Sequence, residues 1–247
     1  MAFDYLLIDV GNGRTKFGLA TRDAILTQRD APTAGLSEGD LDAVLEGWEF
    51  ETVVTSSVVP AATEKLRQYF ADDLLLLRHD IPLGIQITYP RPETIGADRL
   101  ANAVALTHLH GAPGIVIDFG TAVTFDIVDA GGAYVGGVIA PGLRLMTDYL
   151  HERTALLPQV ELQEPAQAIG KSTVGAIQSG AAFGYRGMVR GILGALRGEL
   201  GNPEVLRVVA TGGDAGWIAS GLPEIEAVDE DLTLHGLRLV GNLHAPF

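Results

Sequence analysis

Short hydrophobic runs recur along this chain of 247 residues, separated by polar, Gly-rich and Pro-rich segments. Runs typical of strands lie at 5–10, 16–20, 24–28, 52–57, 74–77, 114–118, 122–128, 134–139 and 205–210. Segments with helical patterns or helix-boundary signals lie at 41–48, 62–70, 97–110, 142–150, 172–200 and 233–242. This alternation predicts an α/β fold whose first three strands form an antiparallel meander. The Pro-rich segment 79–95 predicts a loop.

Two of the predicted strands end in nearly the same pattern. Residues 6–13 carry Asp9 and Gly11 after an apolar run, and residues 115–122 carry Asp118 and Gly120 after another. A second strand follows each Asp-x-Gly turn. The repetition predicts two related halves that face a phosphate group.

Composition narrows the class of protein. Hydrophobic residues make up 47% of the chain, which is ample for a large core. A net charge of −14 disfavours binding to nucleic acid or to an anionic membrane, although a local group of backbone N–H donors can still bind a small anion. The absence of cysteine excludes disulfides, thiolate metal sites and cysteine nucleophiles. No apolar run approaches the ~20 residues of a membrane span, so we expect a soluble, cytoplasmic protein.

The first turn and the strand after it have the chemistry of a phosphate-binding loop. Glycines let the backbone approach an anion closely and direct N–H groups at it. Asp9 can hold water bound to Mg²⁺, and Lys16 can neutralise a transferring phosphoryl group. The alternative is an ordinary hairpin with a charged rim. The candidate residues are Asp9, Val10, Gly11, Asn12, Gly13, Arg14, Thr15 and Lys16.

Several better-known motifs are absent. The dinucleotide fingerprint fails because Lys16 stands where its last glycine would be. Residues 170–172 resemble the end of a P-loop, but Pro165 replaces the first glycine and no predicted strand precedes them. The histidines lack metal-ligand spacing, and no Gly-x-Ser-x-Gly nucleophile motif occurs.

A second candidate segment opens the helix predicted at 97–110. Gly96 and Ala97 precede Asp98 and Arg99 at a helix N-terminus, which attracts anions. Asp98 can accept a proton from a substrate hydroxyl, and Arg99 can bind a carboxylate or phosphate through two nitrogens. The alternative is an aspartate favourably placed in the first helical turn beside an exposed arginine.

The second Asp-x-Gly turn offers further polar groups. Asp118 ends an apolar strand, where an unpaired carboxylate is costly and requires a cation or hydrogen-bond donors. Thr121 and Thr124 add hydroxyls, although Thr124 suits a plain strand position. Asp126 lies on the same strand face as Thr124 and is a weaker candidate. Residues 211–214 form a Gly-rich turn between a strand and a helix, which suits a nucleotide contact or a simple connection.

Together these motifs resemble the acetate and sugar kinase, Hsp70 and actin superfamily, in which two ribonuclease-H-like domains hold ATP. Within it, the chain resembles type III pantothenate kinase nearly end to end. The motifs that carry this resemblance are residues 9–12, 56–60, 89–99, 118–122, 136–142, 170–180 and 211–213.

The resemblance implies two ribonuclease-H-like domains with mixed sheets flanked by helices, at 1–113 and 114–247. It implies phosphorylation of pantothenate by ATP with Mg²⁺, in a homodimer. Asp98 would be the general base, and residues 9–16 the ATP phosphate loop, with Asp9 near Mg²⁺ and Thr121 a further ATP contact. Asp118 would bind a monovalent cation, K⁺ or NH₄⁺. The implied pantothenate contacts are Tyr89, Gly96, Ala97, Asp98, Arg99 and Thr173.

One position departs from the family pattern. The family usually carries Thr or Ser where this chain has Gly13, so a hydroxyl is lost unless Thr15 replaces it. Two other functions stay open at this point. One is an accessory regulatory protein of the same family, and the other is a kinase of the same fold for another small alcohol.

Overall fold

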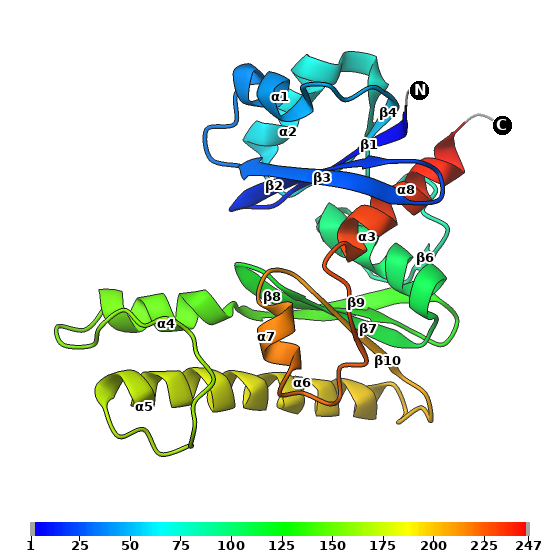
Figure 1. Cartoon of the computed structure of the whole chain (residues 1–247). Coiled ribbons are helices and arrows are strands. Elements are labelled where there is room, and N and C mark those ends of the chain that lie inside the picture. The colour runs from blue at the N-terminus through cyan, green and yellow to red at the C-terminus, as the bar shows by residue number, and fades with distance from the viewer. Residues whose placement is uncertain (1–2, 246–247) are drawn as a thin grey trace. The chain divides into compact units, whose positions relative to one another are not determined.

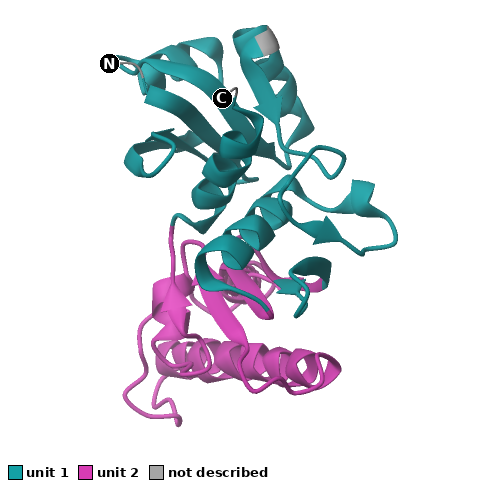
Figure 2. Cartoon of the chain, turned by 90° about the vertical axis from the view of Figure 1, so that its right-hand side faces the viewer, with its two compact units in different colours: residues 1–112, 126–136, 231–247 teal, residues 113–125, 137–230 magenta. Residues whose placement is uncertain are grey.

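The structure is a computed structural model that describes residues 3–245. The chain divides into two compact units, coloured separately in Figure 2. Unit 1 contains the chain up to Ala112, residues 126–136 and the chain from Asp231 onward, and unit 2 contains Pro113–Phe125 and Gly137–Glu230. The predicted division after residue 113 falls beside the first of these boundaries. It does not account for the two later segments that belong to unit 1.

Unit 1 contains a five-stranded mixed sheet (Figure 1). Its strands are β1 (Phe3–Val10), β2 (Arg14–Ala20), β3 (Ile25–Pro32), β4 (Phe50–Ser57) and β5 (Leu74–Leu76), in the spatial order β3-β2-β1-β4-β5. The first three are antiparallel neighbours, which confirms the predicted meander, and β4 and β5 add in parallel. Because side chains alternate across a strand, β1 supplies apolar groups to both faces of the sheet.

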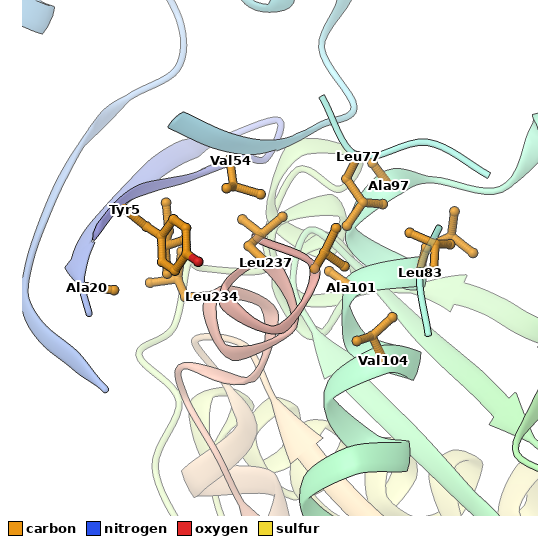
Figure 3. Close-up of a cluster of buried hydrophobic side chains, with 13 residues drawn as sticks. Tyr5, Ala20, Val54, Leu77, Leu83, Ala97, Ala101, Val104, Leu234 and Leu237 are labelled. Atoms are coloured by element: carbon orange, nitrogen blue, oxygen red, sulfur yellow. The ribbon is translucent and has the colours of Figure 1, made fainter. Parts of the chain in front are cut away.

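Helices cover both faces of this sheet. On one face, α1 (Glu38–Leu45) and α2 (Pro60–Phe70) pack on side chains that include Leu6 and Ile8. On the other, α3 (Ala97–Ala105) and α8 (Leu232–His244) surround Tyr5, Leu7 and Val54 (Figure 3). Helix α1 begins earlier than predicted because Ser37 and Asp40 form a capping box.

Helices α3 and α8 approach each other closely. A Cβ placed on Gly236 of α8 would overlap the carbonyl oxygen of Ala101 on α3, so only glycine fits at this crossing. The Thr233 hydroxyl donates to Asn102 Oδ1 at 2.8 Å beside it. Through these contacts α8 packs in unit 1 and holds α3, the helix that begins with Ala97 and Asp98, in place.

The second sheet repeats the topology of the first. Its strands are β6 (Gln86–Ile87), β7 (Gly114–Phe119), β8 (Ala122–Val128), β9 (Ala133–Pro141), β10 (Arg207–Thr211) and β11 (Ala227–Val228), in the order β11-β10-β7-β8-β9-β6. Apart from β6, strands β9-β8-β7-β10-β11 reproduce the order β3-β2-β1-β4-β5. The duplication predicted from the two Asp-x-Gly turns is therefore confirmed. Strand β6 lies inside the segment predicted to be only a loop, and it pairs with β9.

The helices of unit 2 are α4 (Leu143–Glu152), α5 (Thr173–Ser179), α6 (Tyr185–Glu199) and α7 (Ala215–Ala219). A π-helical turn over Gly180–Gly184 joins α5 to α6 within the helical segment predicted at 172–200. Tyr185 is buried and lies against Phe119, with ring centroids 6.4 Å apart. Within residues 3–245, no helix combines the length and the apolar character needed to cross a membrane.

Candidate active site

Asp9 stands at the end of β1 in unit 1, between the side chains of two neighbouring strands. It lies opposite Lys16 on β2 and Ser56 on β4, and the Ser56 hydroxyl donates to Asp9 Oδ1 at 2.5 Å. Burial is the main cause that raises the pKa of Asp9 to about 6. The charge of Asp98 acts in the same direction, while the Ser56 hydrogen bond and Lys16 partly oppose the shift. The site therefore favours a cation or a proton beside Asp9.

The turn after Asp9 is a tight hairpin with an exposed tip. The Gly11 N–H donates to the Arg14 carbonyl at 3.1 Å, which leaves Asn12 and Gly13 at the tip. The Arg14 side chain forms an ion pair with Asp30 on β3. Exposed backbone at a Gly-containing tip suits the approach of an anion.

Thr15 does not contribute a hydroxyl to the surface of this hairpin. Its side chain is fully buried, and its Oγ1 lies 2.9 Å from Thr33 Oγ1. The Thr33 hydroxyl in turn donates to the Gly11 carbonyl at 2.7 Å. The pair thus supports the hairpin from inside, which argues against Thr15 as a replacement for the hydroxyl missing at Gly13. Val10 is also buried, so only its backbone can face a ligand.

Asp98 lies in the first turn of α3, and its carboxylate folds back over the start of the helix. The backbone N–H of Arg99 donates to Asp98 Oδ1 at 2.8 Å. A Cβ placed on Gly96 would lie 2.5 Å from the same oxygen, so the carboxylate occupies the space that a side chain at position 96 would need. Burial raises the pKa of Asp98, and the Arg99 N–H and guanidinium oppose that shift. Ala97, between them, is buried.

Within unit 1, the charge of Asp98 acts on Asp9. The two carboxylates come from residues 89 positions apart in sequence, yet the charge of Asp98 contributes to the raised pKa of Asp9. Two carboxylates that share a site disfavour each other's ionised form. A divalent cation near Asp9 would relieve that repulsion, so the pair suits a metal-bound phosphate ligand.

Arg99 and Tyr89 are connected through the carboxylate of Asp126, which is only a weaker candidate in the sequence. Arg99 Nε lies 2.6 Å from Asp126 Oδ1, and the Tyr134 hydroxyl donates to the same oxygen at 3.2 Å. Tyr134 and Tyr89 meet edge to face, with centroids 6.4 Å apart. Asp126 is fully buried on β8. The available signal in the sequence was an acidic residue inside an apolar strand.

Unit 2 repeats the environment of Asp9 around Asp118. Asp118 ends β7 and lies opposite Thr211 on β10, as Asp9 lies opposite Ser56. The turn after β10 packs on this carboxylate. Gly212 has φ +92, and a Cβ there would lie 2.6 Å from Asp118 Oδ1 and 2.7 Å from the Phe119 backbone. Position 212 therefore requires glycine for its conformation and for its space.

The other two candidates in unit 2 are exposed. The Thr121 carbonyl accepts the Gly142 N–H at 3.2 Å, which joins the second Asp-x-Gly turn to the residue after β9, and the Thr121 side chain is exposed. Thr173 begins α5 after the cap residue Ser172, whose hydroxyl accepts the Gly175 N–H at 3.0 Å. Residues 170–172 thus form a helix cap, and no strand leads into them. The rejection of a P-loop here is confirmed.

The structure brings the candidate residues together in two sets. Unit 1 holds the hairpin at 9–16, Tyr89 and the segment 96–99, and unit 2 holds Asp118, Thr121 and Thr173. Among the side chains that the structure describes (residues 3–245 except Asp72), no three His, Asp or Glu groups converge as a metal site. The residues that fit Mg²⁺ are therefore those that would share it with phosphate oxygens, Asp9 first among them.

Comparison with known families decides the class of this protein. The family model for type III pantothenate kinase matches residues 5–195. The chain belongs to the type III pantothenate kinase family. A type III pantothenate kinase of Akkermansia muciniphila is 51% identical over 97% of this chain and 99% of that protein. Another, of Methylacidiphilum infernorum, is 46% identical over 96% of this chain and 88% of that protein.

Solved structures agree on the fold of this type III pantothenate kinase family member. A conserved Baf-family protein of Campylobacter jejuni, named as a transcriptional activator, superposes with a TM-score of 0.63 at 20% identity, over 96% of this chain and 98% of that chain. A ROK hexokinase of Thermus thermophilus gives a TM-score of 0.53 at 17% identity, over 97% and 98%. At such identities the likeness concerns the fold alone. It confirms the predicted α/β fold of two ribonuclease-H-like sheets flanked by helices.

Proposed function

We propose that this chain transfers the γ-phosphoryl group of ATP to the primary hydroxyl of pantothenate, giving 4′-phosphopantothenate, the first step of coenzyme A biosynthesis. The observation that carries the proposal is identity of 51% to a type III pantothenate kinase along 97% of the chain. The paired, partly buried carboxylates of Asp9 and Asp98 supply the chemistry that such a transfer needs. We place the reaction in the cytoplasm.

The hairpin at residues 9–16 is the proposed cradle for the ATP phosphates. Backbone N–H groups at Asn12 and Gly13 approach the phosphate oxygens, and Lys16 adds positive charge. Asp9 is the residue that would hold Mg²⁺ together with the ATP phosphates. When bound, Mg²⁺ neutralises charge on the transferring group. Thr121 of unit 2 is proposed as a further ATP contact.

Asp98 is the proposed general base. It accepts the proton of the pantothenate hydroxyl as that oxygen bonds to the γ-phosphorus. The bond from the γ-phosphorus to the bridging oxygen of ADP breaks at the same time, and ADP leaves. A pKa raised by burial suits a base because its driving force for taking the proton is greater. Tyr89, Gly96, Ala97, Arg99 and Thr173 are proposed to bind pantothenate.

A phosphoryl-transfer assay over a panel of small alcohols, with pantothenate included and with ATP alone as the control, tests this function. We expect ADP release only when pantothenate is present, with one phosphate added to its hydroxyl. Preference for another alcohol would assign the chain to a same-fold kinase of different substrate. ATP binding with no transfer to any alcohol would favour an accessory regulatory protein of this family.

A monovalent cation is proposed at Asp118. An aspartate at the end of an apolar strand, enclosed by the glycine turn at 212, suits K⁺ or NH₄⁺. We expect the rate in buffers containing only Na⁺ to fall about tenfold below that in K⁺ buffers, a change of ~1.4 kcal/mol in the barrier. Steady-state rates at matched ionic strength measure this, with Asp118→Asn as the variant that loses the K⁺ response. Equal rates in Na⁺ and K⁺ would reject the assignment.

A homodimer is also proposed, through the surface of unit 2. Helix α4 exposes apolar side chains at Leu145, Met146, Tyr149 and Leu150, with 51%, 38%, 58% and 38% of their surface accessible. Glycines of the α5–α6 segment, including Gly184, Gly187 and Gly191, have open space where a side chain would lie. Exposed apolar side chains, together with a helix surface on which glycines carry no side chains, suit close packing by a second copy of the chain. Light scattering checks this by measuring the mass in solution, which should be twice the 26.1 kDa of one chain.

A further inference from the structure

A fully buried carboxylate on β8 has no part in the mechanism above. Asp126 has no accessible surface, and its neighbours Phe125 and Ile127 along the strand are apolar core residues. Burial of an ionised carboxylate is costly unless positive charge and hydrogen bonds compensate it. A strand that needed only to fill the core would carry an apolar residue here. The partners of Asp126 therefore point to its role.

Arg99 and Tyr134 contact the same carboxylate oxygen of Asp126. Arg99 Nε lies 2.6 Å from Asp126 Oδ1, and the Tyr134 hydroxyl donates to that oxygen at 3.2 Å. The Arg99 side chain is only 15% exposed, so its direction is largely set inside the protein. Burial alone would lower the pKa of Arg99, but Asp126 and its neighbours outweigh that effect and raise it. Asp126 thus fixes the direction of the Arg99 side chain and compensates its buried charge.

Arg99 and Tyr134 each contact a further residue of the proposed pantothenate site. On one side, the backbone N–H of Arg99 donates to the Asp98 carboxylate at 2.8 Å. On the other, the ring of Tyr134 packs against Tyr89 at an interplanar angle of 70°. Gly136, two residues beyond Tyr134, also borders the Tyr89 ring, because a Cβ there would lie in van der Waals contact with Tyr89 Cδ2, at 3.7 Å.

We propose that Asp126 is a positioning residue for the phosphoryl acceptor: one buried carboxylate orients Arg99 and, through Tyr134, Tyr89. The inference rests on the proposed function for the place of the acceptor, and it adds a residue outside the contact set. Asp126 does not touch the acceptor. It acts through the two side chains that do, while the ATP hairpin at residues 9–16 has separate supports in Ser56 and Thr33.

The test is the variant Asp126→Asn, which keeps the size of the side chain and removes its charge. We expect the KM for the acceptor to rise about 10- to 100-fold, the range seen when a residue that orients a ligand-binding side chain is changed. The KM for ATP should stay within about twofold, because the hairpin is supported independently. A purely structural role for Asp126 would instead change both KM values together, or neither.

Two further variants separate positioning from general damage. Asp129→Asn makes the same chemical change three residues later, where the carboxylate only accepts the N–H groups of Gly131 and Ala133, at 2.8 and 3.0 Å. Asp129→Asn should lower thermal stability without raising the KM for the acceptor relative to the KM for ATP. The double variant Arg99→Lys with Asp126→Asn should raise the acceptor KM by less than the product of the two single effects, because both changes disturb the Arg99–Asp126 contact and only the path through Tyr134 to Tyr89 is separate.

If Asp126→Asn does not fold, Tyr134→Phe provides the same measurement with a milder change. It removes the hydroxyl that donates to Asp126 and keeps the ring that contacts Tyr89, and we expect a rise of about threefold in the acceptor KM alone. Additive effects in the double variant, or unchanged acceptor KM in a folded Asp126→Asn, would overturn the proposal. The assays use whichever alcohol the wild-type protein phosphorylates. Failure with pantothenate would therefore reject the proposed substrate without deciding the role of Asp126.

Discussion

Asp98→Asn is expected to lower kcat by about 10²- to 10⁴-fold while the protein still folds and binds ATP. Asparagine keeps the shape of the side chain and an oxygen that can accept the Arg99 N–H, which now meets Asp98 Oδ1 at 2.8 Å. It cannot accept the proton of the acceptor hydroxyl. Single-turnover transfer measures the loss, and ATP titration followed by thermal shift checks nucleotide binding. A kcat near that of the wild type would remove Asp98 as the base.

The pH dependence of the wild-type enzyme follows from the same residue. Asp98 must be ionised to accept a proton, and burial raises its pKa above that of an ordinary aspartate. Activity should therefore decline on acidification at a higher pH than an exposed aspartate would give. Because the charge of Asp98 raises the pKa of Asp9, both carboxylates can contribute to the profile, and its midpoints are apparent pKa values. In Asp98→Asn, the residual rate should no longer show the decline at acidic pH that protonation of Asp98 causes.

Gly96→Ala is the companion variant that leaves the carboxylate present but displaces it. A methyl group at position 96 would stand 2.5 Å from Asp98 Oδ1, so the side chain must rotate away from the helix start. We expect Gly96→Ala to lower kcat, as Asp98→Asn does, but by a smaller factor. Stability should change little, because Gly96 has φ −59, which alanine adopts readily. Wild-type kcat in Gly96→Ala would show that the present position of the carboxylate is not required.

Asp9→Asn is expected to abolish measurable transfer and at the same time to stabilise the free protein at neutral pH. The pKa of Asp9 is about 6 in the folded protein, against 3.8 ordinarily, so its ionised form is disfavoured by folding. That difference corresponds to roughly 3 kcal/mol. Asp9 is only partly buried and asparagine can still accept the Ser56 hydroxyl, so we expect a gain of about 1–2 kcal/mol. Such trade-offs between stability and activity are common at functional sites.

The sign of this effect can be checked with pH. Below about pH 4 Asp9 is protonated in both folded and unfolded protein, and the destabilisation is absent. It grows as the pH rises from about 4 to 6 and is complete above that. The difference in melting temperature between Asp9→Asn and wild type should therefore be large at pH 7 and small at pH 4.5. Asp30→Asn, a change at an exposed carboxylate on β3, is the matched control without this pattern. A lower melting temperature for Asp9→Asn at pH 7 would contradict the explanation.

Much of the fold could be predicted because its signals are local. Apolar runs gave the strands at 5–10 and 122–128, and the two Asp-x-Gly turns revealed the duplicated topology that the strand orders confirm. Helix α1 begins before the apolar pattern at 41–48 because the capping box of Ser37 and Asp40 starts it at Glu38. Strand β6 has only two residues, Gln86 and Ile87, and exists through its pairing with β9. Nothing in a Pro-rich segment signals such a pairing.

The sequence alone determined the repeat, the candidate carboxylates at 9, 98 and 118, and the family, because each depends on which residues stand next to one another in the chain. Only the tertiary structure decided what surrounds those carboxylates. It turned Thr15 inward onto Thr33, joined Arg99 to the buried Asp126, and returned α8 to unit 1. Each of these outcomes depends on residues far apart in sequence that meet only when the sheets and helices pack. Burial, which sets the raised pKa of Asp9, exists only after that packing.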